Sequence, residues 1–526
     1  MLSVIKRLLS TMVIILLFAP VSWGNDDTVL TFLHFNDTYA FSPRDGLGGF
    51  APLKTLIDQE IKAAKGPTLI TFGGDAISPT AMGGITQGAH MIELLNAVST
   101  QVAVPGNHEF DFGPEIFQKR LEESSFPWLG ANVLAPDGTV CCGMKDHMIV
   151  DMGGIKVGIF GLVTETTEGF SSTGDNTFES YKKMAEQQVK ALKDQGAEII
   201  VALTHLAFAE DISLSDVDGI NLVLGGHEHD AYAYVNSGKR LLVLKVGWDE
   251  QYLGVVELAV QRGKNGVSVK APGWKVLPVQ DLKPKPNVQK IVSKYEKKQS
   301  QFSVKIGTTE VPLNTILALV GGVETPLGDV ITDAMRTRIT AKDGTKVDAA
   351  LIHGFNFRGM SKNSGDEVTH LNILEALPFA NSVVLVELTG EELKAVLEHS
   401  VSDVAPGSRG RSRFVQLSGL EVTYDPTKTA RTPGCLTPEN KGERILSIKV
   451  DGMPYEPTKK YQVVINNFMA EGGNGYCMLK DATRVEYNGK NLLTDLVVDE
   501  IISLKTITEK HPRIIGRHPG PPFYGQ

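Results

Sequence analysis

Several apolar runs in the first half of this 526-residue chain end in side chains that can bind metal ions. In sequence order these side chains are Asp37, Asp75, Asn107, His108, His205, His227 and His229. Carboxylate, amide and imidazole ligands suit zinc, manganese, iron or cobalt, and the absence of cysteine from the set excludes a thiolate zinc site. Any one of these residues alone is more often a turn former, so the metal prediction depends on their recurrence after strands.

Two metal ions held close together would lower the pKa of a bound water and clamp the oxygens of a displacement at phosphorus. We expect Asp75 to bridge the two ions. His108 directly follows a predicted ligand, Asn107, so its ring is expected to face the substrate and to stabilise charge on the leaving oxygen. Asp111 would orient that ring.

These side chains are carried by an alternating pattern of strands and helices. The runs that are typical of buried strands are TVLTFLHF, PTLITFGG, TQVAVPG, FPWLGANV, GIKVGIFGLV, AEIIVALTH and INLVLGGH. Amphipathic helical patterns lie between them, near 51–64, 87–97, 114–122 and 179–194. This alternation predicts a layered α/β domain, in which the loops at the carboxyl ends of the strands form the ligand crevice.

The motifs GGDAISPT, GNHEFDFG, THL and GGHEHD resemble those of the calcineurin-like metallophosphoesterases, and in particular of the exported 5'-nucleotidase family. The resemblance implies two divalent metal ions, with Zn, Mn, Co or Mg as alternatives. It implies that the first ion is held by Asp37, Asp75 and His229, and the second by Asp75, Asn107, His205 and His227. It also implies that His108 and Asp111 are the catalytic pair.

Tyr39 departs from the family pattern, which has a histidine ligand of the first metal at this position. Three alternatives follow: the phenol binds the ion as phenolate, water fills the vacancy while Tyr39 lines the pocket, or the ring only packs. A free phenol titrates near about pH 10, so phenolate binding would need strong help from the cation. We therefore expect a weakened or water-filled first site.

The second half of the chain offers side chains suited to a nucleotide. Arg358, in the glycine-flanked segment ALIHGFNFRG, could grip phosphate through its planar guanidinium. Phe414 and Tyr476 present aromatic faces that could stack on a base, although a single aromatic residue is more often part of a core.

The segments around these residues resemble the carboxy-terminal domain of the 5'-nucleotidases. The resemblance implies that Phe414 and Tyr476 stack on the base and that Arg358 contacts the phosphate or sugar side. It leaves a second phosphate arginine open between Arg411 and Arg413, and it makes Asp481 a possible ribose contact. The departures from the family pattern are His353, Phe355 and Asn356 in a loop usually richer in Asn and Gly, and Asn467 and Asn474 in place of aspartates.

The chain is long enough for two domains. Residues 1–24 have the character of a signal peptide, with Lys6 and Arg7 before an apolar run that is too short to span a membrane, so we expect a periplasmic or secreted protein. The expected boundaries are 25–281 for the metallophosphoesterase domain, 282–303 for a linker with a connecting helix, 304–518 for a smaller α/β or α+β nucleotide-recognition domain, and 519–526 for a loose tail.

Composition narrows the possible partners. The formal net charge of −9 argues against a general binder of nucleic-acid polymers, and no later segment is apolar enough to span a membrane. Of the four cysteines, we expect Cys435 and Cys477 to pair, since adjacent cysteines such as Cys141 and Cys142 rarely bridge each other. The oligomeric state is left open.

The sequence therefore predicts a metal-dependent hydrolase that removes the phosphate from nucleoside 5'-monophosphates. One alternative is a hydrolase of the same fold that acts on nucleotide sugars, cyclic nucleotides or nucleoside di- and triphosphates. The other is a non-catalytic nucleotide-binding protein whose first metal position has decayed through Tyr39. Asp37, Asp75, His108 and His229 argue against this second alternative.

Overall fold

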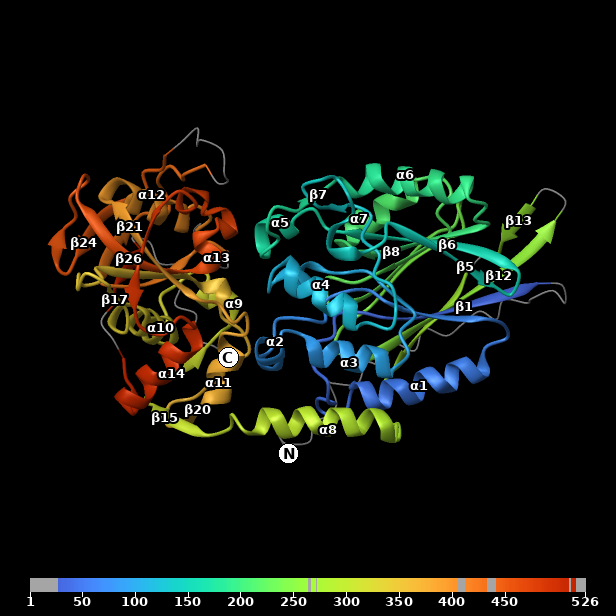
Figure 1. The fold of residues 1–526 in the computed structure, drawn as a ribbon, viewed down its shortest axis with the longest axis horizontal. Coiled ribbons are helices and arrows are strands. Elements are labelled where there is room, and N and C mark those ends of the chain that lie inside the picture. Colours follow the sequence, from blue (N-terminus) through green and yellow to red (C-terminus); the bar gives the residue numbers. More distant parts are fainter. Residues whose placement is uncertain are drawn as a thin grey trace, which may run out of the picture.

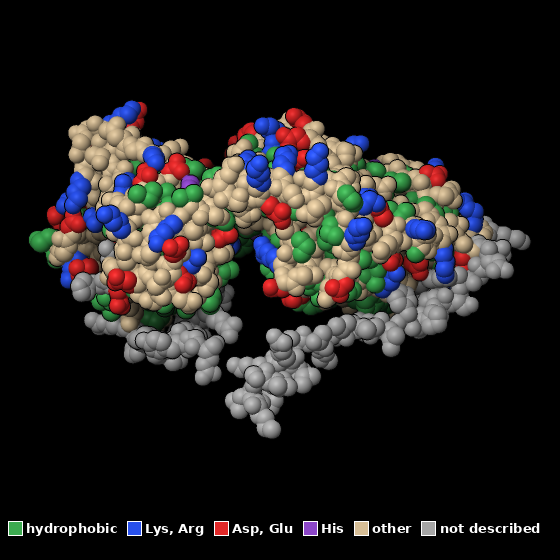
Figure 2. Space-filling view, turned by 90° about the horizontal axis from the view of Figure 1, so that it is seen from below, with side chains coloured by type: hydrophobic (Ala, Val, Ile, Leu, Met, Phe, Trp, Pro, Cys, Tyr) green, Lys and Arg blue, Asp and Glu red, His purple; other side chains and the backbone are tan. Residues whose placement is uncertain are grey.

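The computed structural model describes residues 27–263, 266–270, 272–404, 412–432, 441–509 and 512–516. These residues form two α/β domains joined by one helix, which confirms the predicted fold class (Figure 1). The expected signal segment, 1–24, and the expected tail, 519–526, lie outside the described residues. On the face seen from below, acidic and basic side chains are interspersed over both domains (Figure 2).

The first domain contains two six-stranded sheets. The first sheet consists of β1 (Thr28–Phe35), β2 (Thr68–Phe72), β3 (Val102–Ala103), β12 (Tyr252–Gly263), β13 (Gly266–Val269) and β14 (Gly273–Pro278). The second consists of β5 (His147–Met152), β6 (Ile155–Val163), β8 (Ile199–His205), β9 (Leu222–Gly225), β10 (Ala231–Asn236) and β11 (Leu241–Val246). One hydrophobic core includes strand residues of both sheets.

Parallel pairing gathers the strand ends that carry the predicted ligands. β1, β2 and β3 are parallel neighbours in the first sheet, as are β6, β8 and β9 in the second. The central strands are buried almost throughout, which explains their continuous apolar sequences. The expected helices are α1 (Phe50–Ala63), α3 (Ala89–Ala97), α4 (Pro114–Glu123) and α6 (Tyr181–Asp194).

One predicted strand is wrong over most of its length. The segment FPWLGANV forms only isolated bridges before β4 (Val133–Leu134). Its backbone is shared between the two sheets: the peptide N–H of Leu129 donates to Ala103 of β3, whereas that of Ala131 donates to Gly161 of β6. A segment that crosses from one sheet to the other cannot form a continuous ladder with either.

The proline- and lysine-rich segment forms α8 (Pro286–Ser300), which runs along the first domain and leads into the second (Figure 1). Proline at the first turn suits a helix start because its missing N–H would have no partner there. Val288, Val292 and Tyr295 recur on one face and are buried, where α8 contacts α1 and α3. Within the described ranges, no helix is both long and apolar enough to cross a membrane.

The second domain is built around a five-stranded sheet in the order β22 (Val415–Ser418), β18 (Ala349–His353), β26 (Lys460–Asn466), β21 (Val383–Thr389) and β27 (Thr483–Val485). Two smaller sheets flank it, β25 (Met453–Pro454), β24 (Ile445–Val450), β23 (Leu420–Tyr424) and β30 (Ile514–Gly516), and β20 (Glu367–Thr369), β15 (Lys305–Thr309) and β29 (Thr506–Ile507). The larger helices are α10 (Pro326–Thr337), α11 (His370–Ala376), α12 (Gly390–Ser400) and α14 (Leu493–Leu504).

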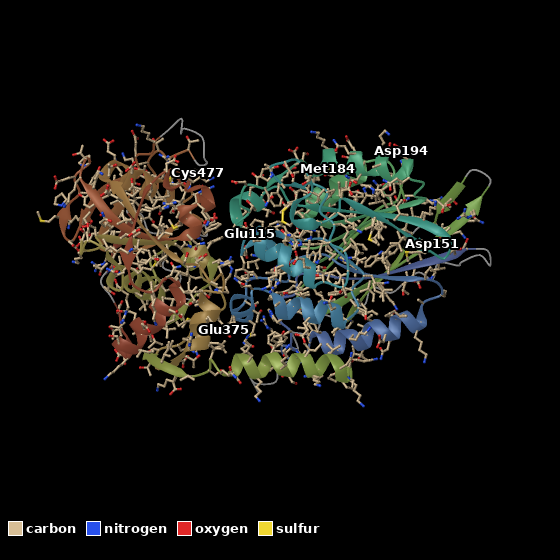
Figure 3. All side chains as sticks on the ribbon, in the orientation of Figure 1. Glu115, Asp151, Met184, Asp194, Glu375 and Cys477 are labelled. Atoms are coloured by element: carbon tan, nitrogen blue, oxygen red, sulfur yellow. A yellow bond between two sulfur atoms is a disulfide. The ribbon has the colours of Figure 1, made fainter. Side chains whose placement is uncertain are left out.

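The cysteines differ from our expectation. Cys141 and Cys142 form a disulfide with each other, so the expectation that these neighbours would not bridge is wrong. They lie in a tight turn in which Cys142 adopts the left-handed backbone conformation, with φ of 63°. Cys477, labelled in the second domain in Figure 3, is disulfide-bonded, whereas its expected partner Cys435 lies outside the described residues.

Candidate active site between the two domains

The structure brings three of the predicted metal ligands into one buried cluster. Asp37, Asp75 and His205 each offer a ligand atom, and these atoms all lie within 4.8 Å of one another. Asp37 and Asp75 follow the carboxyl ends of β1 and β2, and His205 is the last residue of β8. The cluster therefore joins the two sheets at the edge where their parallel strands end.

The local backbone is shaped to aim these side chains inward. Asp37, Asp75, His227 and His229 all have positive φ, between 53° and 99°, a conformation that non-glycine residues adopt in only a few per cent of cases. Glycine is required beside them, since a Cβ on Gly106 would lie 2.0 Å from Asp75 Oδ1. A side chain at position 106 would therefore collide with the Asp75 carboxylate.

The donor set fits a divalent cation. His205 Nδ1 is 2.7 Å from the carbonyl oxygen of Gly73, which leaves Nε2 facing Asp75 Oδ2 at 3.2 Å. Among the described residues, His205 Nε2 and Asn107 Oδ1 are buried without a hydrogen-bond partner. Burial disfavours charge on His205, but the carboxylates of Asp75 and Asp37 outweigh it and raise its pKa to about 10. The site thus attracts positive charge.

The other two histidines predicted as ligands lie next to this cluster. His229 Nε2 is 3.4 Å from Asp37 Oδ1, and its ring stacks on Trp248. The backbone N–H of His227 donates to Asp37 Oδ2 at 2.9 Å, and the His227 and His205 rings are 5.1 Å apart. All the histidines predicted as ligands therefore come close to the same carboxylates.

Glu109 holds the backbone next to the cluster in place. This residue was not identified from the sequence. Its carboxylate accepts backbone N–H groups from Asp75, Ala76, Ile77 and Gly106 at 2.5–3.2 Å. It thereby ties the loop after β2 to the loop after β3. The available signal was its spacing, since a glutamate three residues after a helix N-cap is typical of a capping interaction.

Tyr39 lies among the residues expected to hold the first metal. Its hydroxyl donates to Asp75 Oδ2 at 2.9 Å and lies 3.0 Å from His229 Nε2 and 3.4 Å from Asp37 Oδ1. Burial, followed by the charges of Asp75 and Asp37, raises the pKa of this phenol well above its usual value. A ring that only packs, the third alternative, does not fit these hydrogen bonds.

His108 and Asp111 form the predicted pair. His108 Nδ1 is 2.6 Å from Asp111 Oδ2, and the backbone N–H of His108 donates to Asp75 Oδ1 at 2.9 Å. Nε2 is therefore the ring atom left for a substrate. Burial opposes protonation of His108, but Asp111 and then Asp75 outweigh it and raise its pKa to about 9.

A cavity of about 290 Å³ lies between the two domains. From the first domain it is lined by Asn107, His108, Asp111, Thr166, Phe170, Ser171, Ser172 and His227. From the second domain it is lined by Leu317, His353, Phe355, Asn356, Arg358, Phe379, Asn381, Phe468 and Asn474. We call these two sets the first-domain wall and the second-domain wall.

Arg358 faces the first domain from the second-domain wall. Its guanidinium donates to the carbonyl oxygens of Phe355 and, at 2.9 Å, Phe357, and it lies 5.0 Å from the centre of the Phe379 ring. Burial lowers the pKa of Arg358 to about 10, although the charge of Asp111 acts in the opposite direction. At neutral pH it is a fixed cation opposite His108 and Asp111.

The expected stacking pair does not reach the cavity. Phe414 is 2% exposed and contacts Tyr424 in the core of the second domain. Tyr476 is fully buried, contacts His399, and donates its hydroxyl to the carbonyl oxygen of Arg413. Neither aromatic side chain lines the cavity.

The other expected nucleotide contacts also lie elsewhere. Arg413 pairs with Asp403, and Asp481 is exposed; neither lines the cavity. Arg411 lies outside the described residues. Of the nucleotide-binding residues expected in the second domain, the structure therefore brings Arg358 alone to the cavity within the described ranges. The phenylalanines of the second-domain wall, Phe355, Phe379 and Phe468, were not expected to bind a ligand.

Comparisons with known proteins agree with this two-domain arrangement. Residues 30–231 match the calcineurin-like phosphoesterase family, and residues 305–481 match the 5'-nucleotidase C-terminal domain. The chain is 27% identical to the human 5'-nucleotidase over 533 residues, which cover 93% of this chain and 90% of that protein.

Two further relatives are informative. The trifunctional nucleotide phosphoesterase YfkN of Bacillus subtilis is 28% identical over 504 residues, which cover 87% of this chain but only 33% of that protein. The crystal structure of a 5'-nucleotidase precursor from Thermus thermophilus superimposes with a TM-score of 0.72 at 27% identity, over 93% of this chain and 100% of that one.

Proposed function

Because this chain belongs to the 5'-nucleotidase family, we propose that it is a metal-dependent enzyme that converts nucleoside 5'-monophosphates to nucleoside and phosphate. One observation carries the proposal: a single cavity has Asn107, His108 and His227 on its first-domain wall and Arg358 on its second-domain wall. A nucleotide bound there would have its phosphate between the metal ligands and a fixed guanidinium.

The metal ions would be held by the clustered residues of the first domain. Asp37, Asp75 and His229 would bind the first ion, and Asp75, Asn107, His205 and His227 the second. Divalent ions at these positions would lower the pKa of water and neutralise charge on the phosphate oxygens. The donor set suits Zn, Mn, Co or Mg.

The side chains of the protein supply the remaining steps. His108 carries a proton at neutral pH, so its Nε2 can donate to the leaving 5'-oxygen as negative charge develops there. Asp111 holds the ring by its other nitrogen. Arg358, itself fixed by two carbonyl oxygens, orients the phosphate or sugar from the opposite wall.

Tyr39 would weaken the first metal position. Its phenol is protonated and hydrogen-bonded to Asp75, so it takes part of the space that a histidine ligand would use without supplying an imidazole nitrogen. The first ion would then keep a water in place of that ligand and be held less tightly than the second. Export to the periplasm or the medium, expected from residues 1–24, belongs to the same proposal.

The proposal is tested with a panel of substrates on the chain that begins at Asn25. AMP, ADP, cyclic AMP and a UDP-sugar are supplied separately with Mn, Co, Zn or Mg, and both free phosphate and free nucleoside are measured. AMP is expected to yield the two products in equal amounts and faster than the others react. Faster cleavage of another substrate would assign the site to that class, and binding of AMP without turnover in any metal would make the protein a binding protein.

A further inference from the structure

Two hydrogen-bond donors on the second-domain wall have no partner. His353 and Asn356 are 4% and 2% exposed, and both line the cavity. Within the described part of the chain, His353 Nε2 and Asn356 Nδ2 make no hydrogen bond. Buried polar atoms are nearly always paired in native proteins, with protein or with water, so two unpaired donors on one cavity wall are positions where a bound molecule could supply the acceptor.

The surrounding hydrogen bonds fix the orientation of the Asn356 amide. Asn466 Oδ1 accepts the backbone N–H of Met469 at 3.1 Å, so the Asn466 atom that faces Asn356 at 3.3 Å is its amide nitrogen. Asn381 Nδ2 donates to the same Asn356 atom at 2.5 Å. Both neighbours therefore require an oxygen at that position, and the unpaired atom of Asn356 is its nitrogen, a donor.

A similar argument fixes the hydrogen on His353. Asn474 Nδ2 donates to the carbonyl oxygen of Ser412 at 3.1 Å, so it is the amide nitrogen, and it lies 3.0 Å from His353 Nδ1. That ring nitrogen must accept, which leaves the hydrogen of a neutral imidazole on Nε2. Burial, followed by the charge of Arg358, lowers the pKa of His353 to about 3 and keeps the ring neutral.

The same wall carries aromatic rings that can contact a flat ligand. Phe355 and Phe468 line the cavity, and the Phe468 ring centre lies 5.4 Å from that of His353. Gly473 makes room for this ring, because a Cβ there would lie 2.4 Å from it. Aromatic side chains stack on nucleobases with little preference among them, so a preference has to come from groups at the base edge.

We propose that His353 and Asn356 select nucleotides whose base has a carbonyl oxygen at carbon 6 of a purine or carbon 4 of a pyrimidine, namely hypoxanthine, guanine and uracil nucleotides, over those of adenine and cytosine, which have an amino group there. This rests on the proposed function, because a phosphate at His108 places the nucleoside against the opposite wall. A carbonyl oxygen has two lone pairs and no hydrogen, so it can accept hydrogen bonds from donors of this wall. The amino group of adenine or cytosine would face them with further donors and leave them unpaired.

Two matched substrate pairs test the inference. Inosine and adenosine monophosphates differ in the group at carbon 6 of the base, with the accompanying change at N1, and uridine and cytidine monophosphates differ similarly at carbon 4 and N3. We expect kcat/KM for inosine monophosphate and for uridine monophosphate, the members with a carbonyl at carbon 6 or carbon 4, to be about tenfold higher or more than for their partners. Equal kcat/KM within both pairs would overturn the inference while leaving the proposed function in place.

Variants separate base recognition from other roles of the two donors. Asn356→Asp keeps the oxygen that Asn381 and Asn466 require but replaces the donor with an acceptor, so the preference should shrink or reverse. His353→Leu removes the second donor, together with the Nδ1 acceptor that pairs with Asn474, and should reduce the preference. Asn488→Asp, the same change at an exposed residue of β28 (Tyr487–Asn488), should leave it unchanged.

An equal loss for all four substrates in Asn356→Asp and His353→Leu would instead assign these donors to the phosphate or ribose and overturn the inference. If the metal-loaded chain hydrolyses none of the four, the proposed function fails, and calorimetric titration with the same nucleotides then tests the preference on its own. Tighter binding of inosine and uridine monophosphates than of their partners would support the preference, and equal affinities within both pairs would overturn it.

Discussion

Both sides of the cavity hold buried polar atoms without a hydrogen-bond partner among the described residues, but the atoms differ in position. His205 Nε2 and Asn107 Oδ1 lie at the predicted metal site, and the atoms of the second-domain wall do not. On the first-domain side, Asp75 is bonded to Tyr39 and to the backbone of His108, while Glu109 ties the neighbouring loops together. On the second-domain side, His353 and Asn356 keep donors that nothing in the described chain satisfies. In the proposed function, the groups of the reaction are thus held in place by the protein itself, whereas His353 and Asn356 would find their hydrogen-bond acceptors on the substrate.

Among single substitutions in the first-domain wall, removal of the His108 side chain should lower turnover the most. His108→Ala is expected to lower turnover by about 100-fold or more, since a positioned proton donor contributes roughly that much. Metal content, measured by elemental analysis, should stay unchanged because His108 offers no ligand atom to the cluster.

His147→Ala is the matched control, because His147 lies in the same domain and contacts Gln188 and Gln195 away from the cavity. Unchanged turnover in His108→Ala would remove this residue from the mechanism. A parallel loss of metal would make it a structural residue of the metal site.

Arg358 lies on the second-domain wall, opposite His108. Its removal should lower activity less than the removal of His108 does. Arg358→Ala is expected to lower kcat/KM for AMP by about tenfold or more, because a hydrogen bond to a charged group is lost. Arg358→Lys keeps the charge but not the planar fork, and it should recover only part of the loss. Full recovery with lysine would show that charge alone matters at this position.

Tyr39 lies at the predicted first metal position and should affect binding of the first ion more than binding of the second. Tyr39→His is expected to tighten binding of the first ion severalfold by supplying an imidazole nitrogen, while Tyr39→Phe should bind it as the wild type does. Isothermal titration with Mn or Zn measures both. Loss of affinity in Tyr39→Phe would mean that the phenolate is a ligand after all.

Substitution of His90, which lies away from both walls, should have the smallest effect, a change in how the free energy of unfolding depends on pH. Burial, followed by the charge of Lys298, lowers the pKa of His90 from 6.5 to about 3. Unfolding lets this ring take up a proton below about pH 6.5, so its contribution to the free energy of unfolding falls as the pH falls through that window. In denaturant titrations of the metal-free protein, His90→Gln should reduce the pH slope by at most about 1.4 kcal/mol per pH unit. Identical pH slopes of the free energy of unfolding in the wild type and in His90→Gln would contradict this contribution of His90.

The sequence predicted the residues on the first-domain side of the cavity better than those of the second-domain wall. TVLTFLHF corresponds to β1 and the 179–194 pattern to α6, because apolar periodicity is a local signal. Parallel pairing brings Asp37 and Asp75 together at one edge of the first sheet. His205 joins them because the second sheet, which carries it, packs against the first.

The second-domain wall depends on packing that no local pattern specifies. Phe414 and Tyr476 stand in loop-like sequences but are buried in a core, whereas Phe468, in a similar setting, lines the cavity. Which aromatic side chain turns inward is decided by contacts between distant segments, such as the 4.6 Å contact of Tyr476 with His399. The disulfide between Cys141 and Cys142 likewise depends on the backbone angle of one residue.

The most direct test of the metal-dependent reaction is AMP hydrolysis after metal removal. The chelated, dialysed chain should release no phosphate and should recover on stepwise addition of Mn, Co, Zn or Mg. Asp75→Asn should not recover, because Asp75 would bind both ions. Asp194→Ala, at an exposed position at the end of α6 (Figure 3), should recover as the wild type does. Hydrolysis that persists without metal, or full recovery of Asp75→Asn, would contradict the account.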